Sequence, residues 1–166
     1  MVDIQTVSAI VTAAGVLIGI VYYLLEIRHQ TQIRETDLQI RMNPVFNLTA
    51  IDWQQAWYKV SALEYKDYDD FVKKYGSIID TETPTTMAIL TQCNYFEAIG
   101  YLLKRNLVGI DYVYDCYADG AIMMWEKVRP VVEGMRKQFN TPRVWEPFEY
   151  LYNEMKKREQ AGIKNG

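Results

Sequence analysis

The sequence has few of the residues from which catalytic and metal sites are usually built. Its 166 residues include two cysteines and a single histidine, His29. It has no Gly-rich phosphate loop and no G-x-S-x-G or H-E-x-x-H motif, so the common nucleotide-binding, hydrolase and zinc-protease signatures are absent. We therefore predict no catalytic residue, no metal site, no cofactor and no enzymatic activity.

Cysteine is too scarce for a disulfide scaffold, and positive charge is too scarce for a typical nucleic-acid-binding domain. Cys93 and Cys116 lie far apart in segments with helical patterning, so they form no C-x-x-C motif, and we predict reduced residues in or near the core. There are 21 acidic and 18 basic residues, giving a net charge of −3, whereas nucleic-acid-binding domains are usually basic. We expect no disulfide scaffold and no nucleic-acid partner.

Charge is missing altogether from one N-terminal segment. The run IQTVSAIVTAAGVLIGIVYYLL lies between Asp3 and Glu26, and as a helix it would be about 33 Å long, enough to cross a hydrocarbon core of about 30 Å. Tyr22 and Tyr23 fall where an aromatic belt belongs. A cleaved signal peptide would have a basic n-region and a small-residue cleavage site, neither of which is found here. We therefore predict a transmembrane anchor, in contact with membrane lipid, over residues 1–25.

The basic residues that flank the predicted anchor indicate its orientation. No Lys or Arg precedes it, whereas Arg28, Arg34 and Arg41 follow it. The positive-inside rule then predicts a single-pass protein of the plasma membrane whose C-terminal domain is cytoplasmic. Glycine and proline are absent just after the anchor, which predicts that its helix continues as a stalk over residues 26–43.

One face of the predicted membrane helix is small and polar. Its residues recur at alternating intervals of three and four: Gln5, Ser8, Thr12, Gly15, Gly19, Tyr22 and Glu26. Lipid provides no hydrophobic drive for helix association, so close packing depends on small residues, and the two glycines form a GxxxG motif. We predict a helix–helix interface of Ser8, Thr12, Gly15 and Gly19, which we call the small-residue face. Through it the chain would form a homo-oligomer or bind a partner membrane protein.

Two other functions are compatible with the same pattern. In a small homo-oligomeric ion channel, the hydroxyls of Ser8 and Thr12 would line the pore, and Tyr22, Glu26 and His29 would form a polar ring at the membrane interface. Alternatively, the domain after the stalk would be a small-ligand binder or an enzyme. Metal analysis and bilayer conductance distinguish these alternatives from the leading prediction of a non-enzymatic scaffold or accessory subunit.

The spacing of the small-residue face continues into the stalk through His29, Ile33, Thr36 and Ile40. Only two of these four side chains are strongly apolar. We therefore do not expect the stalk to form a coiled coil independently.

The remaining residues, 44–166, predict an all-helical bundle without convincing strand patterning. Several helix boundaries are marked by capping residues, glycine or proline. We expect helices to start near Pro44, Asp67, Thr83, Asp111 and Thr141. We also expect Gly76 to end a short helix, Gly120 to break a helix, Pro130 to begin or kink one, and Pro147 to kink the last helix or delay its start.

Acidic residues of this domain are interpreted as structural. Three aspartates recur every four residues along one predicted helix: Asp111, Asp115 and Asp119. A metal site needs carboxylates that converge from several elements, so we interpret this stripe as a solvated face. Glu97 is expected to be partly buried and to pair with a base such as Lys104 or Arg129.

Three stretches together resemble a known family: WYKVSALEYKDYDDFVKKYG (residues 57–76), YFEAIGYLLKRNLVGIDYVYD (95–115) and MMWEKVRPVVEGMRKQFNTPRVWEPFEYLYNEMKKREQ (123–160). The chain is similar to an uncharacterised family of small, single-pass, all-helical prokaryotic membrane proteins, many of them archaeal. The resemblance implies a prokaryotic membrane protein, and it implies no activity and no functional residue.

Overall fold

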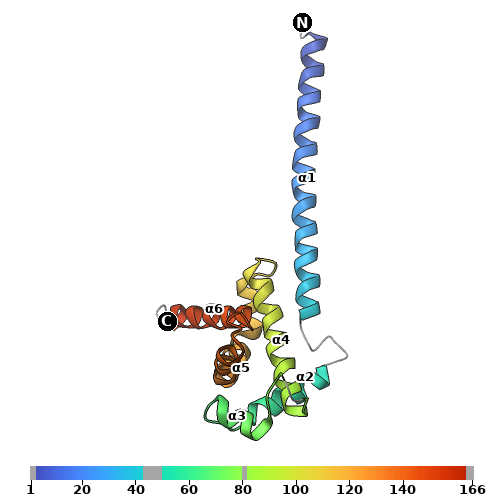
Figure 1. Ribbon diagram of the computed structural model, residues 1–166. Helices are drawn as coiled ribbons and strands as arrows, with labels where there is room; N and C mark the ends of the chain where they lie inside the picture. Colours follow the sequence, from blue (N-terminus) through green and yellow to red (C-terminus); the bar gives the residue numbers. More distant parts are fainter. Residues whose placement is uncertain (1–2, 43–49, 80–81, 164–166) are drawn as a thin grey trace. The chain divides into compact units, whose positions relative to one another are not determined.

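The protein is all-α. The computed structural model describes residues 3–42, 50–79 and 82–163, and these residues form helices without any strand. The helices, labelled in Figure 1, are α1 (Ile4–Met42), α2 (Ala50–Ser61), α3 (Tyr68–Tyr75), α4 (Pro84–Lys104), α5 (Ile110–Phe139) and α6 (Glu146–Ile163). They divide into two compact units, Met1–Ile40 and Arg41–Gly166. The predicted all-α fold with a long apolar N-terminal helix is confirmed.

The first unit is the single helix α1. It is 39 residues long, which corresponds to about 58 Å, so the predicted anchor and stalk form one continuous helix. The span Val7–Leu38 is long and apolar enough to cross a membrane, and no part of its most apolar stretch is buried. All the side chains that the structure describes on α1 are exposed or half-buried. The helix therefore presents its whole apolar surface to its surroundings.

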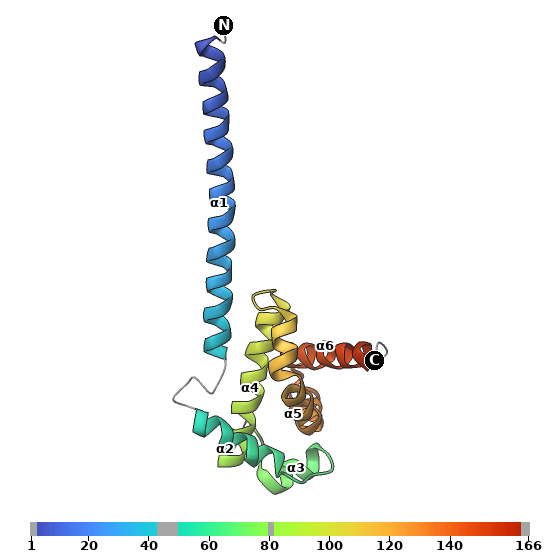
Figure 2. The same cartoon turned by 180° about the vertical axis from the view of Figure 1, so that it is seen from behind.

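The second unit is a helical bundle built around α4. This helix packs against α6 and α2, while α5 packs against α6 and α3 (Figures 1 and 2). Aromatic rings join three of the helices in the core: Phe148 stacks on Phe96 at 5.0 Å and meets Trp125 edge-on at 4.9 Å, measured between ring centroids. All three side chains are almost completely buried. Burial of these rings stabilises the centre of the bundle.

Two helix boundaries agree with the capping residues in the sequence. The Asp67 side chain accepts a hydrogen bond from the backbone N–H of Asp70 at the start of α3, and Gly76 ends this helix at a φ of 87°. Thr83 begins α4 with a capping box to Thr86. These boundaries follow from local hydrogen bonding, which is why the sequence predicts them. The predicted start at Pro44 lies outside the described residues.

The predicted break at Gly120 and the predicted cap at Asp111 are wrong. Helix α5 begins at Ile110, after Gly109, so the expected start near Asp111 is confirmed but Asp111 lies in the first turn and is not the cap. The helix continues without a break through Gly120, and Pro130 lies inside it and does not begin a helix. Its buried side chains follow helical spacing along the whole length: Val113, Tyr117, Ala121, Trp125, Val128 and Val132. Burial of this continuous apolar stripe outweighs the local cost of glycine and proline, which is about 1 and 3 kcal/mol.

The start of the last helix is delayed, which is one of the two outcomes expected for Pro147. Helix α6 begins at Glu146, so Pro147 occupies its second position, where no intrahelical partner exists for the missing N–H. The backbone N–H of Glu146 donates to the carbonyl of Arg143 at 3.2 Å. The N–H of Phe148 donates to the carboxylate of Glu97 on α4 at 2.9 Å. Thus α4 supplies a cap to α6.

The crossing of α4 and α6 depends on Gly100. A Cβ atom at this position would lie 2.0 Å from the carbonyl oxygen of Pro147 and 3.2 Å from the Cβ of Leu151. Because the first of these contacts is with backbone, no side-chain rotation can relieve it. Glycine therefore permits the close approach that allows Glu97, one turn earlier, to reach Phe148.

Candidate functional site

The small-residue face is an open surface on α1. All four of its residues, Ser8, Thr12, Gly15 and Gly19, are exposed and lie on successive turns of the same helix. Among the described residues, a Cβ atom added at either glycine would meet nothing within 4 Å. The helix thus carries a shallow strip of bare backbone, which is the shape that another helix can approach closely.

The hydroxyl of Thr12 is already engaged within the helix. Its Oγ1 donates to the carbonyl oxygen of Ser8 at 2.9 Å. Because this donor is satisfied, it needs neither water nor a partner when Thr12 enters an apolar interface. Gly15 and Gly19, the next residues along the face, have no side-chain polar group to offer to water. The face therefore suits helix packing better than the lining of an aqueous pore.

The three residues predicted to form a polar ring lie on one side of α1. Tyr22 is 69% exposed, and His29 is also exposed. Glu26 is half-buried, and its carboxylate accepts a hydrogen bond from the Gln30 side chain at 3.2 Å. Since all three residues share one helix face, they would surround an axis only when several copies of the helix associate.

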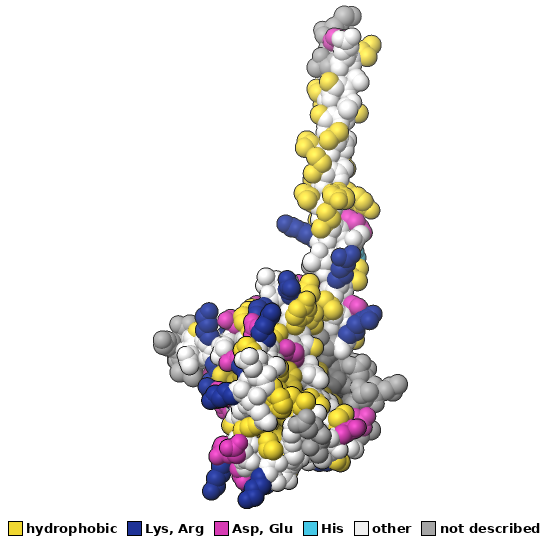
Figure 3. Space-filling view, in the orientation of Figure 1, with side chains coloured by type: hydrophobic (Ala, Val, Ile, Leu, Met, Phe, Trp, Pro, Cys, Tyr) yellow, Lys and Arg dark blue, Asp and Glu magenta, His cyan; other side chains and the backbone are white. Residues whose placement is uncertain are grey.

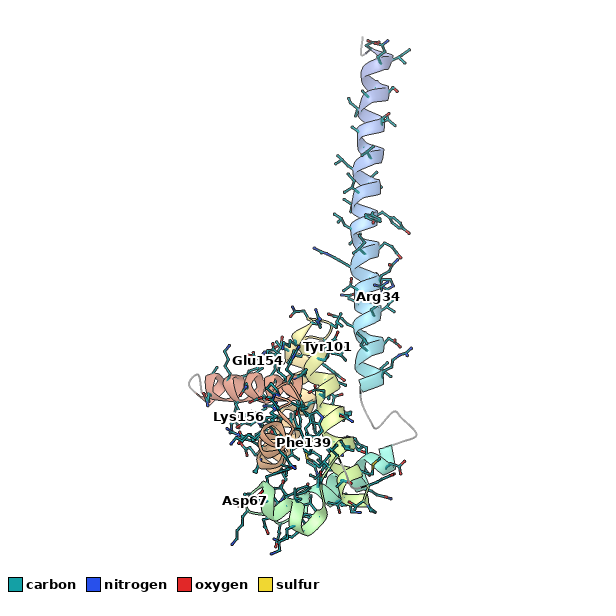
Figure 4. All side chains as sticks on the ribbon, in the orientation of Figure 1. Arg34, Asp67, Tyr101, Phe139, Glu154 and Lys156 are labelled. Atoms are coloured by element: carbon teal, nitrogen blue, oxygen red, sulfur yellow. The ribbon has the colours of Figure 1, made fainter. Side chains whose placement is uncertain are left out.

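The basic residues lie on the C-terminal half of α1. Arg28, Arg34 and Arg41 are all exposed. Apolar side chains dominate the N-terminal part of α1 in Figure 3, and Lys and Arg side chains appear only further along the helix. Figure 4 labels Arg34 within this charged part. The structure thus keeps the charge asymmetry on which the predicted orientation depends.

At least three cavities lie on the described part of the helical domain, and these three gather no catalytic set of side chains. A groove of about 820 Å³ lies between α3 and α5, and its polar lining includes Asp67, Asp69, Lys73 and Lys137. A cavity of about 430 Å³ lies where α4 meets the start of α6. It is lined by Glu97, Tyr101, Lys104, Arg105, Arg143, Glu146 and Pro147. Figure 4 labels Tyr101 near the C-terminal end of α4. A third cavity, of about 360 Å³, lies along α5 and is lined by residues such as Asp115, Cys116 and Asp119.

Glu97 is the most unusual ionisable group near the second cavity. Burial raises the pKa of its carboxyl, while the hydrogen bond from the Phe148 N–H and the charge of Arg136 act in the opposite direction. The predicted ion pair is wrong, because Lys104 bonds to Glu146 at 2.7 Å and Arg129 to Glu133 at 2.7 Å. The role of Glu97 as a helix cap was missed because its partner lies 51 residues away in the sequence.

The other candidate groups of the domain are dispersed. The aspartate stripe is exposed, and its first member, Asp111, forms an ion pair with Arg158. No three His, Cys, Asp or Glu residues come close enough to hold a metal ion within the described parts of the chain. Both cysteines are free, as predicted. Burial raises the pKa of the Cys93 thiol, but Cys116 is exposed, contrary to the prediction of a position in or near the core.

A cluster of tyrosines in the domain core was not predicted. The ring centroids of Tyr95 and Tyr117 lie 6.4 Å apart, and the hydroxyls of Tyr112 and Tyr117 lie 3.3 Å apart. Burial raises the pKa of both Tyr95 and Tyr117 above the usual tyrosine range, so they are neutral hydrogen-bonding groups. The helical spacing of the aromatic residues in the sequence predicts burial but not this pairing between α4 and α5.

Comparison with known proteins places the chain in a family. Residues 9–155 match a family described as "Domain of unknown function (DUF4760)". The chain belongs to this family. The matched region of this DUF4760 protein begins within α1 and ends within α6, so it covers most of each compact unit. The predicted membership of an uncharacterised family is confirmed. No curated protein and no solved structure matches the chain.

Proposed function

We propose that this DUF4760 protein is a prokaryotic, single-pass protein of the plasma membrane that assembles in the bilayer through its small-residue face. In this proposal α1 spans the membrane, and the three arginines after the apolar segment keep the helical domain in the cytoplasm. The protein acts as a homo-oligomerising, accessory or scaffold subunit of a membrane assembly and has no enzymatic role.

The exposed backbone at the two glycines of the small-residue face is the observation on which this proposal rests. Aliphatic side chains elsewhere on the helix are solvated by lipid tails as well as by another helix, so they provide no driving force for association. At Gly15 and Gly19, in contrast, two backbones can come close together and gain van der Waals and Cα–H···O contacts that lipid tails do not provide. Assembly through this face removes no charged group from water, because none lies within it.

The proposal is tested by adding bulk to this face. In the double variant Gly15→Ile/Gly19→Ile, two branched side chains would keep the partner backbones apart, so the particle in mild detergent is expected to fall to one copy. Ala13→Ile/Ala14→Ile is the matched control. It adds similar apolar bulk about 130° away around the helix from the small-residue face.

Size-exclusion chromatography with light scattering measures the protein mass of each particle, with 19.4 kDa expected for one copy. The control should keep the mass of the parent protein. An unchanged oligomer in the glycine variant, or equal dissociation of the control, would show that this face is not the interface.

A further inference from the structure

We infer that the stalk binds the stalk of a second copy of this chain. Residues 26–42 of α1 in the two copies form a parallel, in-register, two-stranded coiled coil. This inference rests on the proposed function, because membrane assembly brings the two stalks together. It extends that function by naming the partner, the orientation and the number of strands for a surface outside the membrane.

Exposed isoleucines mark the side of the stalk that needs a partner. Ile33 is 55% exposed and Ile40 is 51% exposed, and they lie seven residues apart. They continue the alternating interval of three and four on which the small-residue face is built, through His29 and Thr36. In coiled-coil notation both isoleucines occupy position a, where a β-branched side chain favours two parallel strands.

Four of the six charged side chains of the stalk lie away from the seam. Arg34 and Arg41 lie at position b, and Arg28 and Glu35 lie at position c. Of the two acidic residues that remain, Glu26 occupies position a at the membrane end and Asp37 the flanking position e, while Gln30 and Gln32 occupy other flanking positions. Two copies can therefore approach without bringing the arginines against one another, which would otherwise oppose a self-association.

The membrane explains why a seam with polar members can still pair. A lone helix of about 17 residues is marginal in water, and His29 and Thr36 weaken the seam further. Two copies joined within the bilayer, however, enter the cytoplasm parallel and in the same register. Pairing of the stalks is then an intramolecular step at an effective concentration of about millimolar. The stalk pair is thus conditional on the membrane pair.

Two threonines of the stalk provide a matched test of this geometry. The Oγ1 of Thr36 donates to the carbonyl of Gln32, and the Oγ1 of Thr31 donates to the carbonyl of Ile27, both at 2.9 Å. Thr36 lies on the seam at position d, whereas Thr31 lies on the opposite side at position f. Cysteine is nearly isosteric with threonine, so Thr36→Cys and Thr31→Cys should disturb the helix equally little.

The experiment uses the full-length chain in native membranes, in a Cys116→Ser background that removes the exposed native thiol. A disulfide needs Cα atoms within about 4.4–6.8 Å, a separation that only the seam positions of paired helices reach. On mild oxidation Thr36→Cys is expected to form disulfide-linked dimers at least ten times faster than Thr31→Cys. Ile33→Lys, which places a charge in the seam, should lower the cross-linking of Thr36→Cys.

The outcomes separate this inference from the proposed function. Equal cross-linking at the two positions, or none, in a particle that light scattering shows to hold two copies would overturn the stalk pair and leave assembly through the small-residue face intact. A particle of one copy would overturn both. A particle of three or more copies would overturn the two-stranded stalk alone.

Discussion

Replacing Gly100 by alanine should destabilise the helical domain, although alanine is the better helix former. The added Cβ atom would lie 2.0 Å from the backbone carbonyl oxygen of Pro147. Because tolerable contacts begin at about 3.0 Å, α4 and α6 must separate by about 1 Å where they cross. This separation also pulls the Glu97 carboxylate away from the Phe148 N–H that it caps.

The expected change in the free energy of unfolding has three contributions, of which two are destabilising and one is stabilising. Overpacking of this kind costs about 1–3 kcal/mol, and loss of a hydrogen bond to a charged group costs about 1.5 kcal/mol. The higher helix propensity of alanine stabilises the domain by about 1 kcal/mol. The expected net loss for Gly100→Ala is about 2 kcal/mol. For a domain of this size the corresponding fall in Tm is about 6–10 °C.

The same substitution at Gly120 provides the control. A Cβ there would lie 3.6 Å from the Phe96 ring and 3.7 Å from the Trp57 ring, which are ordinary contacts. Gly120→Ala should therefore raise the Tm by a few degrees, about 0.5–1 kcal/mol of stability. Thermal unfolding of the full chain in detergent, followed by circular dichroism, measures both. A Gly100→Ala protein as stable as its parent would refute the reasoning about this helix crossing.

Two more predictions concern single groups of the domain. Since burial raises the pKa of Glu97 above its unfolded value, the stability contributed by its protonated form is lost as pH rises through the folded pKa. The Tm of Glu97→Gln minus that of the parent should therefore increase from pH 4 to pH 7, and a difference that falls or stays constant would contradict this. A membrane-impermeant maleimide should label the exposed Cys116 only in permeabilised cells, while Cys93 reacts only after unfolding. Labelling of Cys116 in intact cells would reverse the proposed orientation.

Features of the fold that depend on neighbouring residues could be predicted from the sequence. Asp67 and Thr83 are bonded within three residues, and the continuation of α1 beyond the apolar segment follows from residues 20–42, which include no glycine or proline. Features that depend on packing could not. Gly120 and Pro130 look like helix breaks locally, yet they lie inside α5 because its buried stripe is continuous.

The candidate site shows the same division. The small-residue face of α1 is contained in one helix, so its spacing in the sequence is also its arrangement in space. The contact of Glu97 with the start of α6 joins two helices, and no spacing rule relates Glu97 to Phe148. Gly100 likewise carries no local signal, since its importance comes from the Pro147 backbone across the helix crossing.

The mass of the full-length particle, extracted in mild detergent and measured by light scattering, tests the central claim most directly. Assembly through the small-residue face, with paired stalks, predicts twice the 19.4 kDa of one chain, falling to a single copy in Gly15→Ile/Gly19→Ile. A parent protein of 19.4 kDa under the same conditions would contradict assembly in the membrane.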